Sequence, residues 1–344
     1  MELETTKRQR WIDIVRGIGI MLVVVGHVSS NEILVSWIYS FHMPLFFFIS
    51  GWLMQKYAGQ AILNKAYIQK KIYQLLVPFI EYRFILIVWW VLVEKRFREL
   101  DLGPIWFLPT IFIAYILVAL LIHFSNNMKK SLLMFISLVA VMIVVIYMHS
   151  ILHIRTRIGE FCYVWLVRAI CATTWMFLGI CVKIVYGRIS ENTKKYTIPV
   201  MAFWAVISIV LFQLNGDVSM FNLQFGTSYL CYYVSGLSGI LVLFLFAAKW
   251  MKKNTVVEFV GRKSIIIMAF HEPIKRVLFK LIDIICSVVK INSSYELMRQ
   301  NLLGGIILSL VVVLITCAII LILERVIDTM PKNKLTKVLF AFVK

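Results

Sequence analysis

Arg16 and His27 can do chemistry, and both lie in an otherwise apolar stretch that runs from residue 11 to 30. At about 100° per residue, the eleven steps between them return to within roughly 20° of the starting azimuth. The two side chains therefore share one helix face about 16 Å apart along the axis. A guanidinium can hold an anion there and an imidazole can accept a proton. Ionisable groups are costly inside hydrocarbon, so we interpret this face as a candidate functional site.

The composition is that of a membrane protein. Hydrophobic residues make up 61% of the 344 residues, and the mean hydropathy is +0.87; an ordinary soluble domain is roughly 45–50% apolar. Apolar runs of about 20 residues can cross a bilayer core of about 30 Å as helices, and the alternating pattern of a membrane barrel is missing. We predict an all-α, polytopic integral membrane helical bundle.

Reading the apolar runs along the chain predicts about ten transmembrane helices. The connectors between them are too short to hold a second domain, so we expect residues 1–344 to form a single membrane domain without a fused soluble catalytic domain. The predicted spans are residues 12–30, 38–57, 72–93, 105–124, 131–148, 161–185, 196–212, 229–249, 264–287 and 302–324.

The placement of lysine and arginine predicts the orientation of the bundle. If the N-terminus is cytoplasmic, most of the Lys and Arg residues fall in cytoplasmic connectors, and an even number of spans puts both termini on that side. The formal net charge of +19 is then a topology and lipid-headgroup signal, and we expect no nucleic-acid partner. The six cysteines fall in apolar spans without metal-ligand spacing, so we expect no metal.

Several segments resemble the membrane acyltransferase 3 family. Residues 13–27 resemble its first helix, including the Arg-x10-His spacing of Arg16 and His27, and residues 41–51 resemble its second helix almost residue for residue. Residues 105–108 and 260–274 extend the similarity over most of the chain, from about residue 9 to 325. In length the chain is similar to the fucose 4-O-acetylase-like branch.

The resemblance implies a membrane O-acyltransferase in the bacterial plasma membrane. We expect it to move an acetyl group, or another short acyl group such as succinyl, from cytoplasmic acetyl-CoA to a hydroxyl of a cell-envelope glycan or its lipid-linked precursor. Membrane lipids are the other expected partner. The acceptor sugar, its hydroxyl position and the oligomeric state are not indicated by the sequence.

The expected chemistry assigns roles to the first helix. Acyl transfer to a hydroxyl needs a base for the hydroxyl proton and a positive or hydrogen-bonding environment for the tetrahedral oxyanion. We predict that His27 is the general base and that Arg16 grips a phosphate of the donor. Asp13, three residues before Arg16, would orient it. The alternatives are an Arg16 that anchors the helix at the interface and a His27 that is bonded across helices for structure alone.

The chain departs from the family just before the third helix. The family usually has an Arg-x-x-Arg pair there, whereas this chain has Lys71 at the first position and Gln74 at the second. Lys70 and Lys71 are therefore our candidates for donor binding. A lysine offers a point charge where an arginine offers a planar fork, so the donor site is adjusted or the correspondence fails here.

Two histidines near prolines are candidates for the acceptor side. His42 comes two residues before Pro44, and His271 with Glu272 comes directly before Pro273. Proline frees a backbone carbonyl in the preceding turn and lets a helix bend. Each histidine can therefore bind the acceptor sugar or simply hydrogen-bond the exposed backbone, and the sequence leaves both open.

Trp106 is a further candidate for the acceptor side, because an indole can stack on a sugar. It follows Pro104 at a predicted outer interface, where tryptophan commonly anchors a span among headgroups, and we rank that alternative first.

Glu81, Arg83 and Arg168 are further charges inside predicted spans. We interpret them first as partners in salt bridges between helices and second as groups of the acceptor site.

A function of another class remains open at this stage. The same bundle could export or flip a lipid-linked saccharide, because intramembrane ionisable groups also mark transport pathways. The two halves of the sequence show no inverted repeat and no paired interrupted helices, which argues against a transporter. Binding or hydrolysis of acetyl-CoA would separate the two, since a transporter should ignore it.

Overall fold

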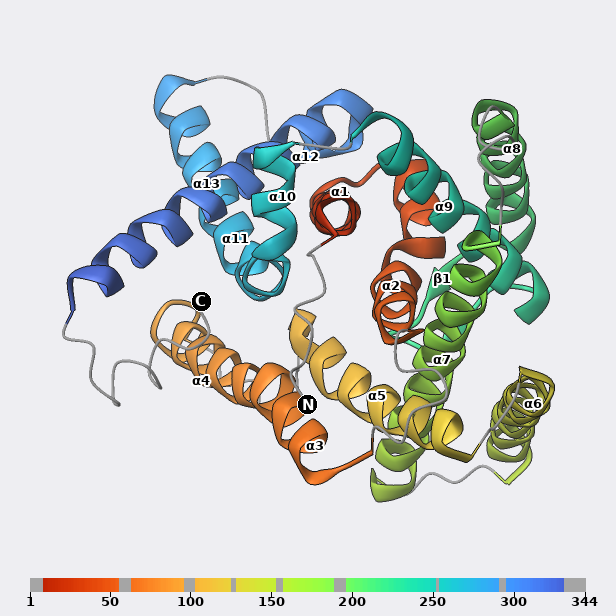
Figure 1. Ribbon diagram of the computed structural model, residues 1–344. Helices are drawn as coiled ribbons and strands as arrows, with labels where there is room; N and C mark the ends of the chain where they lie inside the picture. Colours follow the sequence, from red (N-terminus) through yellow and green to blue (C-terminus); the bar gives the residue numbers. More distant parts are fainter. Residues whose placement is uncertain are drawn as a thin grey trace.

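The computed structural model describes residues 9–55, 63–95, 103–124, 128–152, 157–188, 196–251, 254–290 and 295–330. Within these ranges the chain consists of helices and one two-stranded hairpin, which confirms the predicted all-α class. Figure 1 shows the helices as a bundle in which α1 stands near the middle.

The elements, in chain order, are α1 (Arg10–Val28), α2 (Glu32–Met54), α3 (Lys65–Lys71), the π-helical segment η2 (Ile72–Leu76), α4 (Val77–Leu92), the 3-10 turn η3 (Gly103–Trp106), α5 (Phe107–Phe124), α6 (Met128–Leu152), α7 (Arg157–Tyr186), α8 (Thr197–Asn215), β1 (Val218–Ser219), β2 (Gln224–Phe225), α9 (Tyr229–Trp250), α10 (Thr255–Arg262), α11 (Ser264–Val289), α12 (Tyr295–Gln300) and α13 (Leu302–Thr329).

Among the described residues, nine helical stretches are long and apolar enough to cross a membrane, one fewer than the predicted ten. The difference is the span predicted at 264–287. Helix α11 forms there, and its 26 residues make it about 39 Å long. Its charged residues, which include Glu272, Lys275 and Arg276, keep α11 out of the nine apolar stretches. The chain is a multi-pass membrane protein. The cytoplasmic placement of both termini, which is inferred from the Lys and Arg distribution and an even number of spans, stays a prediction.

Helix α1 is surrounded by α2, α10, α11, α13 and α9. Two glycines permit the closest of these contacts. A Cβ at Gly17 would overlap the carbonyl of Val257 in α10, and a Cβ at Gly261 would overlap the carbonyl of Asp13. Small residues allow helix backbones to approach closely in membranes, so α10 can lie directly against the N-terminal half of α1.

Helix α2 begins earlier than predicted and follows α1 after a very short turn. The side chain of Asn31 accepts a hydrogen bond from Leu34 N at 3.0 Å and starts the helix at Glu32 instead of residue 38. The turn holds α1 and α2 side by side. The aromatic run Phe46–Phe48 of α2 is buried in the core and does not face lipid.

The predicted connector between α8 and α9 contains a hairpin that sequence analysis missed. Val218 pairs with Phe225 in antiparallel strands. Asn215 holds the base of the hairpin, because its Nδ2 donates to Phe225 O at 3.0 Å and its Oδ1 accepts from Ser228 N at 3.0 Å. The hairpin brings residues 219–222 over a cavity between the helices.

Candidate active site

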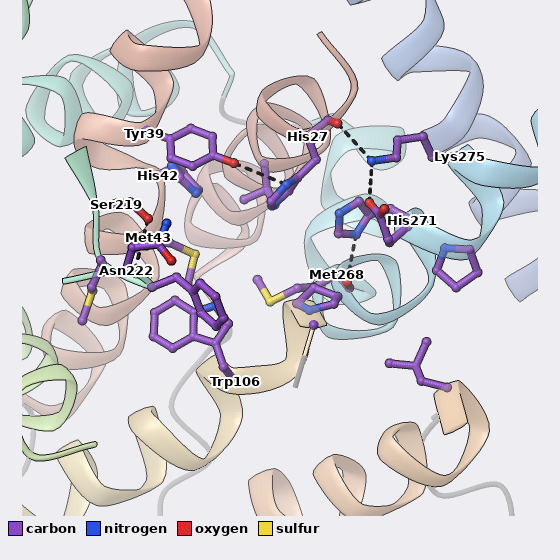
Figure 2. A pocket seen from close by; sticks show the side chains of 18 of the residues that line it. His27, Tyr39, His42, Met43, Trp106, Ser219, Asn222, Met268, His271 and Lys275 are labelled. Carbon is purple, nitrogen blue, oxygen red and sulfur yellow. Dashed lines mark hydrogen bonds and ion pairs between the residues drawn. The ribbon is translucent and has the colours of Figure 1, made fainter. Parts of the chain in front are cut away.

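A cavity of about 360 Å³ lies between α1, α2, α4, η3, α9, α11 and the hairpin (Figure 2). Its volume is in the range of small-molecule sites, roughly 300–1,000 Å³. Segments far apart in the sequence contribute to it. The predicted site residues that line it are His27, His42, Trp106, His271 and Glu272.

The rings of His42 and His271 are oriented by their own helices. His42 Nδ1 lies 2.9 Å from Ile38 O, and His271 Nδ1 lies 2.8 Å from Met268 O. A carbonyl oxygen only accepts hydrogen bonds, so Nδ1 carries the proton in both rings and Nε2 is left as an acceptor. The two alternatives for these residues are therefore compatible: each histidine bonds the backbone through one nitrogen and keeps the other for the cavity.

His27 lies between these two rings and a tyrosine. Its Nδ1 is 3.4 Å from the hydroxyl of Tyr39, and its ring centroid is 5.1 Å from that of His271. Tyr39 also contacts His42, with ring centroids 4.7 Å apart. Tyr39 was not singled out from the sequence. Its position three residues before His42, on the same helix face, is the signal that would have found it.

Lys275 connects α11 to the end of α1 beside His27. Its Nζ donates to the main-chain oxygen of His27 at 3.2 Å and pairs with Glu272 Oε2 at 2.6 Å. Arg276 takes the other oxygen of Glu272 at 3.1 Å. Arg299 of α12 donates to the next carbonyl, Val28 O, at 2.6 Å. Cations thus cap the C-terminal carbonyls of α1, where they also favour the helix dipole.

Glu272 was predicted to bind substrate, and its carboxylate lies at the cavity with both oxygens engaged by Lys275 and Arg276. Lys275 was missed from the sequence. It follows Glu272 at i, i+3 on a helix with one polar face, a spacing that would have indicated an ion pair. The pair makes Glu272 the group that holds Lys275 against α1.

Trp106 is buried, with 6% of its surface exposed, and lines the cavity. The alternative of an anchor among lipid headgroups does not fit this burial. Arg168 packs against Trp106 and Phe221, with its guanidinium carbon 5.1 Å from the Trp106 ring centroid and 4.5 Å from that of Phe221. Arg168 also donates to Phe221 O. Its described partners are thus aromatic faces and a carbonyl, and not the carboxylate expected of a salt bridge.

Two of the predicted donor residues, Arg16 of α1 and Lys71 of α3, lie near Tyr115 of α5 and away from His27. Arg16 Nη1 lies 3.6 Å from Asp13 Oδ1, which supports Asp13 as the group that orients Arg16. Lys71 Nζ lies 3.4 Å from the ring centroid of Tyr115 in α5. Tyr115 interacts electrostatically with both Arg16 and Lys71 and hydrogen-bonds to Ser50.

The structure separates the two lysines that the sequence offered. Lys71 faces Tyr115, whereas Lys70 and Gln74 are exposed. Tyr115 was not predicted, since nothing in its neighbourhood in the sequence marks it. We call Arg16, Lys71 and Tyr115 the cation cluster; of the described residues that line the cavity, none belongs to it.

Helix α1 connects the cation cluster to the cavity. Val23 and His27 line the cavity, and Arg16 lies seven residues before Val23, close to two helical turns away on the same face. The cluster and the cavity are thus held by one rigid element at a separation of about 16 Å between Arg16 and His27.

The chain is similar to a known protein family and to a curated relative. Residues 9–324 match a family described as an acyltransferase domain. Nodulation protein NolL of Mesorhizobium japonicum is 33% identical over 149 residues, which are 36% of this chain and 38% of that protein. The match therefore covers less than half the length of this curated relative. No solved structure matches the chain.

Proposed function

Because the chain belongs to the membrane acyltransferase 3 family, we propose that it transfers an acetyl or other short acyl group from cytoplasmic acyl-CoA to a hydroxyl of a cell-envelope glycan or its lipid-linked precursor. The chain is a membrane acyltransferase; the donor, the acceptor and the bacterial plasma membrane are part of the proposal. The observation that carries it is the cavity in which His27, His42 and His271 meet, with Arg16 of the cation cluster on the same helix as His27.

His27 acts as the general base in this proposal. The contact with Tyr39 engages Nδ1, which leaves Nε2 for the acceptor hydroxyl. As the hydroxyl oxygen attacks the thioester carbonyl, its proton passes to Nε2. The tetrahedral intermediate then expels the thiolate of coenzyme A, which takes the proton from the imidazolium. A positioned base of this kind contributes roughly 10²- to 10⁴-fold to a rate.

The other cavity residues bind the acceptor. His42 and His271 present Nε2 atoms that accept hydrogen bonds from sugar hydroxyls other than the reacting one. The face of Trp106 offers a flat apolar surface for the sugar ring. Glu272 acts through Lys275, which holds the main chain at His27. These contacts select a sugar by the placement of its hydroxyls.

The cation cluster binds the donor. Arg16, held by Asp13, and Lys71 supply positive charge, and the Tyr115 hydroxyl beside Lys71 adds a hydrogen-bonding group. Charge-assisted hydrogen bonds of this type are the usual means of holding phosphate groups. The thioester end of acyl-CoA would then lie farther along α1, toward His27.

Mass spectrometry of the surface glycan tests the function directly. Cells that carry the wild-type chain should show glycan with an added mass of one acyl group, and cells with His27→Ala should not. Purified wild-type protein should also hydrolyse acetyl-CoA or transfer its acetyl group to an acceptor. An unmodified glycan together with no use of acetyl-CoA by a folded protein would reject the enzyme and favour an exporter of lipid-linked saccharide.

A further inference from the structure

A second cavity, of about 350 Å³, lies on the other side of α11. We call it the apolar groove. Side chains of α11 and α13 form most of its lining, and Trp89 of α4 closes one edge. Among the described residues, the polar side-chain groups of its lining are the Thr316 hydroxyl and the Trp89 indole N–H. The Thr316 hydroxyl already donates to Val312 O at 2.6 Å. A sugar placed in this groove would lose most of its hydrogen bonds, which is costly.

The apolar groove meets the active-site cavity at the seam between α4 and α11. Pro273 of α11 lines both cavities. On α4, Leu86 and Trp90 line the active-site cavity, and the neighbouring Trp89 lines the apolar groove. A ligand at this seam can therefore have one part in each cavity.

Helix α11 presents a different surface to each cavity. Glu272, Lys275 and Arg276 line the active-site cavity, whereas Ile274 and Leu278 line the apolar groove. The groove follows α11 from residue 266 to 281, which is about 22 Å along the helix axis. This shape fits an extended hydrocarbon chain, and the adjoining polar cavity fits a polar head.

An unpaired donor lies at the same seam. Trp89 Nε1 is buried and has no hydrogen-bond partner among the described residues. A buried N–H group without an acceptor is unfavourable, and an oxygen of a bound molecule would satisfy it. An amphiphile whose chain lies in the groove carries such oxygens where its chain joins its head.

We propose that the apolar groove binds the hydrocarbon chain of the acceptor, so that the acceptor is a lipid-linked saccharide and not a finished, chain-free polymer. This proposal rests on the proposed acyl transfer to a glycan. The chain lies along α11, its linking oxygen meets Trp89 Nε1, and its sugar passes Pro273 to reach His27. Because bilayer lipid is as apolar as the groove, the groove contributes orientation and not a hydrophobic driving force. Holding the sugar beside the base in this way raises its effective concentration there.

Comparing acyl transfer to two acceptors tests the role of the apolar groove independently of the rest of the site. The acceptors are the methyl and the dodecyl glycoside of the sugar that glycan mass spectrometry identifies, tested with acetyl-CoA and the full chain in lipid nanodiscs. Ile315→Trp fills the groove. Leu314→Trp is the matched control, because the neighbouring Leu314 is 65% exposed and does not line the groove. We expect Ile315→Trp to lower kcat/KM for the dodecyl glycoside by roughly tenfold, the scale of an overpacked site.

The methyl glycoside should react equally with wild type, Ile315→Trp and Leu314→Trp. An equal loss with both glycosides, or no loss with either, would overturn the groove while leaving the acyltransferase intact. If wild type acylates neither glycoside, the proposed function fails instead.

A second measurement does not depend on activity. A dodecyl glycoside with a diazirine at the chain end should crosslink to α11 and α13 in wild type, and this labelling should fall in Ile315→Trp. Labelling spread evenly over α6 and α8, whose spans are only 6% and 11% buried, would show that the chain stays in bulk lipid and would reject the proposal.

Discussion

Replacing Lys275 with methionine tests whether Lys275 positions His27 for catalysis. Methionine keeps most of the length of the side chain but loses the charge and the two contacts of Nζ, to His27 O at 3.2 Å and to Glu272 Oε2 at 2.6 Å. The Lys275 side chain is only 14% exposed, so water replaces these contacts poorly. A hydrogen bond that involves a charged group contributes about 1.5–3 kcal/mol. Glu272 keeps Arg276, so we expect a net loss of about 2 kcal/mol in stability.

The larger effect should be on catalysis. Without Lys275 the last carbonyls of α1 lose one of their two cationic caps, and the His27 side chain is free to shift. A shift of about 1 Å can cost roughly 10²-fold in rate. We expect Lys275→Met to lower kcat by about 10- to 100-fold with little change in the KM for acetyl-CoA, because the cation cluster is untouched. Lys275→Arg, which keeps the charge, should restore part of kcat.

Acetyl transfer by purified protein, followed with its pH profile and a thermal melt, checks these expectations. Lys280→Met is the matched control, since Lys280 is exposed on the same helix and does not line the cavity. If Lys275→Met melts earlier but keeps the wild-type kcat, Lys275 supports the fold alone and the positioning argument is refuted. An equal loss with Lys280→Met would refute it as well.

Other perturbations test the remaining assignments. His27→Ala should reduce acyl transfer by at least about 10²-fold without a change in melting temperature, and residual transfer near the wild-type rate would exclude it as the base. Lys71→Ala should raise the KM for acetyl-CoA by about tenfold, the cost of one charge-assisted contact, while Lys70→Ala should leave it unchanged; titration of acetyl-CoA in the transfer assay compares them. The hydrogen bond from Arg10 lowers the pKa of Glu258 below its ordinary 4.5. That contribution to stability is present above pH 4.5 and is lost as the pH falls through the folded-state pKa. Glu258→Gln should therefore melt earlier than wild type at pH 7, with a smaller difference at pH 4; a difference that grows on acidification would contradict the assignment.

Local patterns in the chain were enough to predict the long helices and the face shared by Arg16 and His27, although the short helices α10 and α12 lie in segments that were predicted as connectors. A helix repeats every 3.6 residues whatever surrounds it, so the spacing of two residues on one helix determines their relative direction. Apolar runs of membrane length likewise predict spans without any knowledge of their neighbours. Proline two residues after His42 and after His271 was visible in the same way.

The convergence of the site was decided only by tertiary structure. His27, His42, His271 and Trp106 come from elements up to 244 residues apart, and the apolar faces of these helices are too similar in sequence to specify which will pack together. The spacing of Tyr39 to His42 and of Lys275 to Glu272 indicates neighbours on one helix, but the contacts of Tyr39 and Lys275 with His27 cross between helices and depend on the packing of the bundle. The sequence alone thus determined which groups each helix carries and on which face, because those depend on short-range geometry. Which faces meet to form the cavity and the apolar groove depends on the packing of the whole bundle.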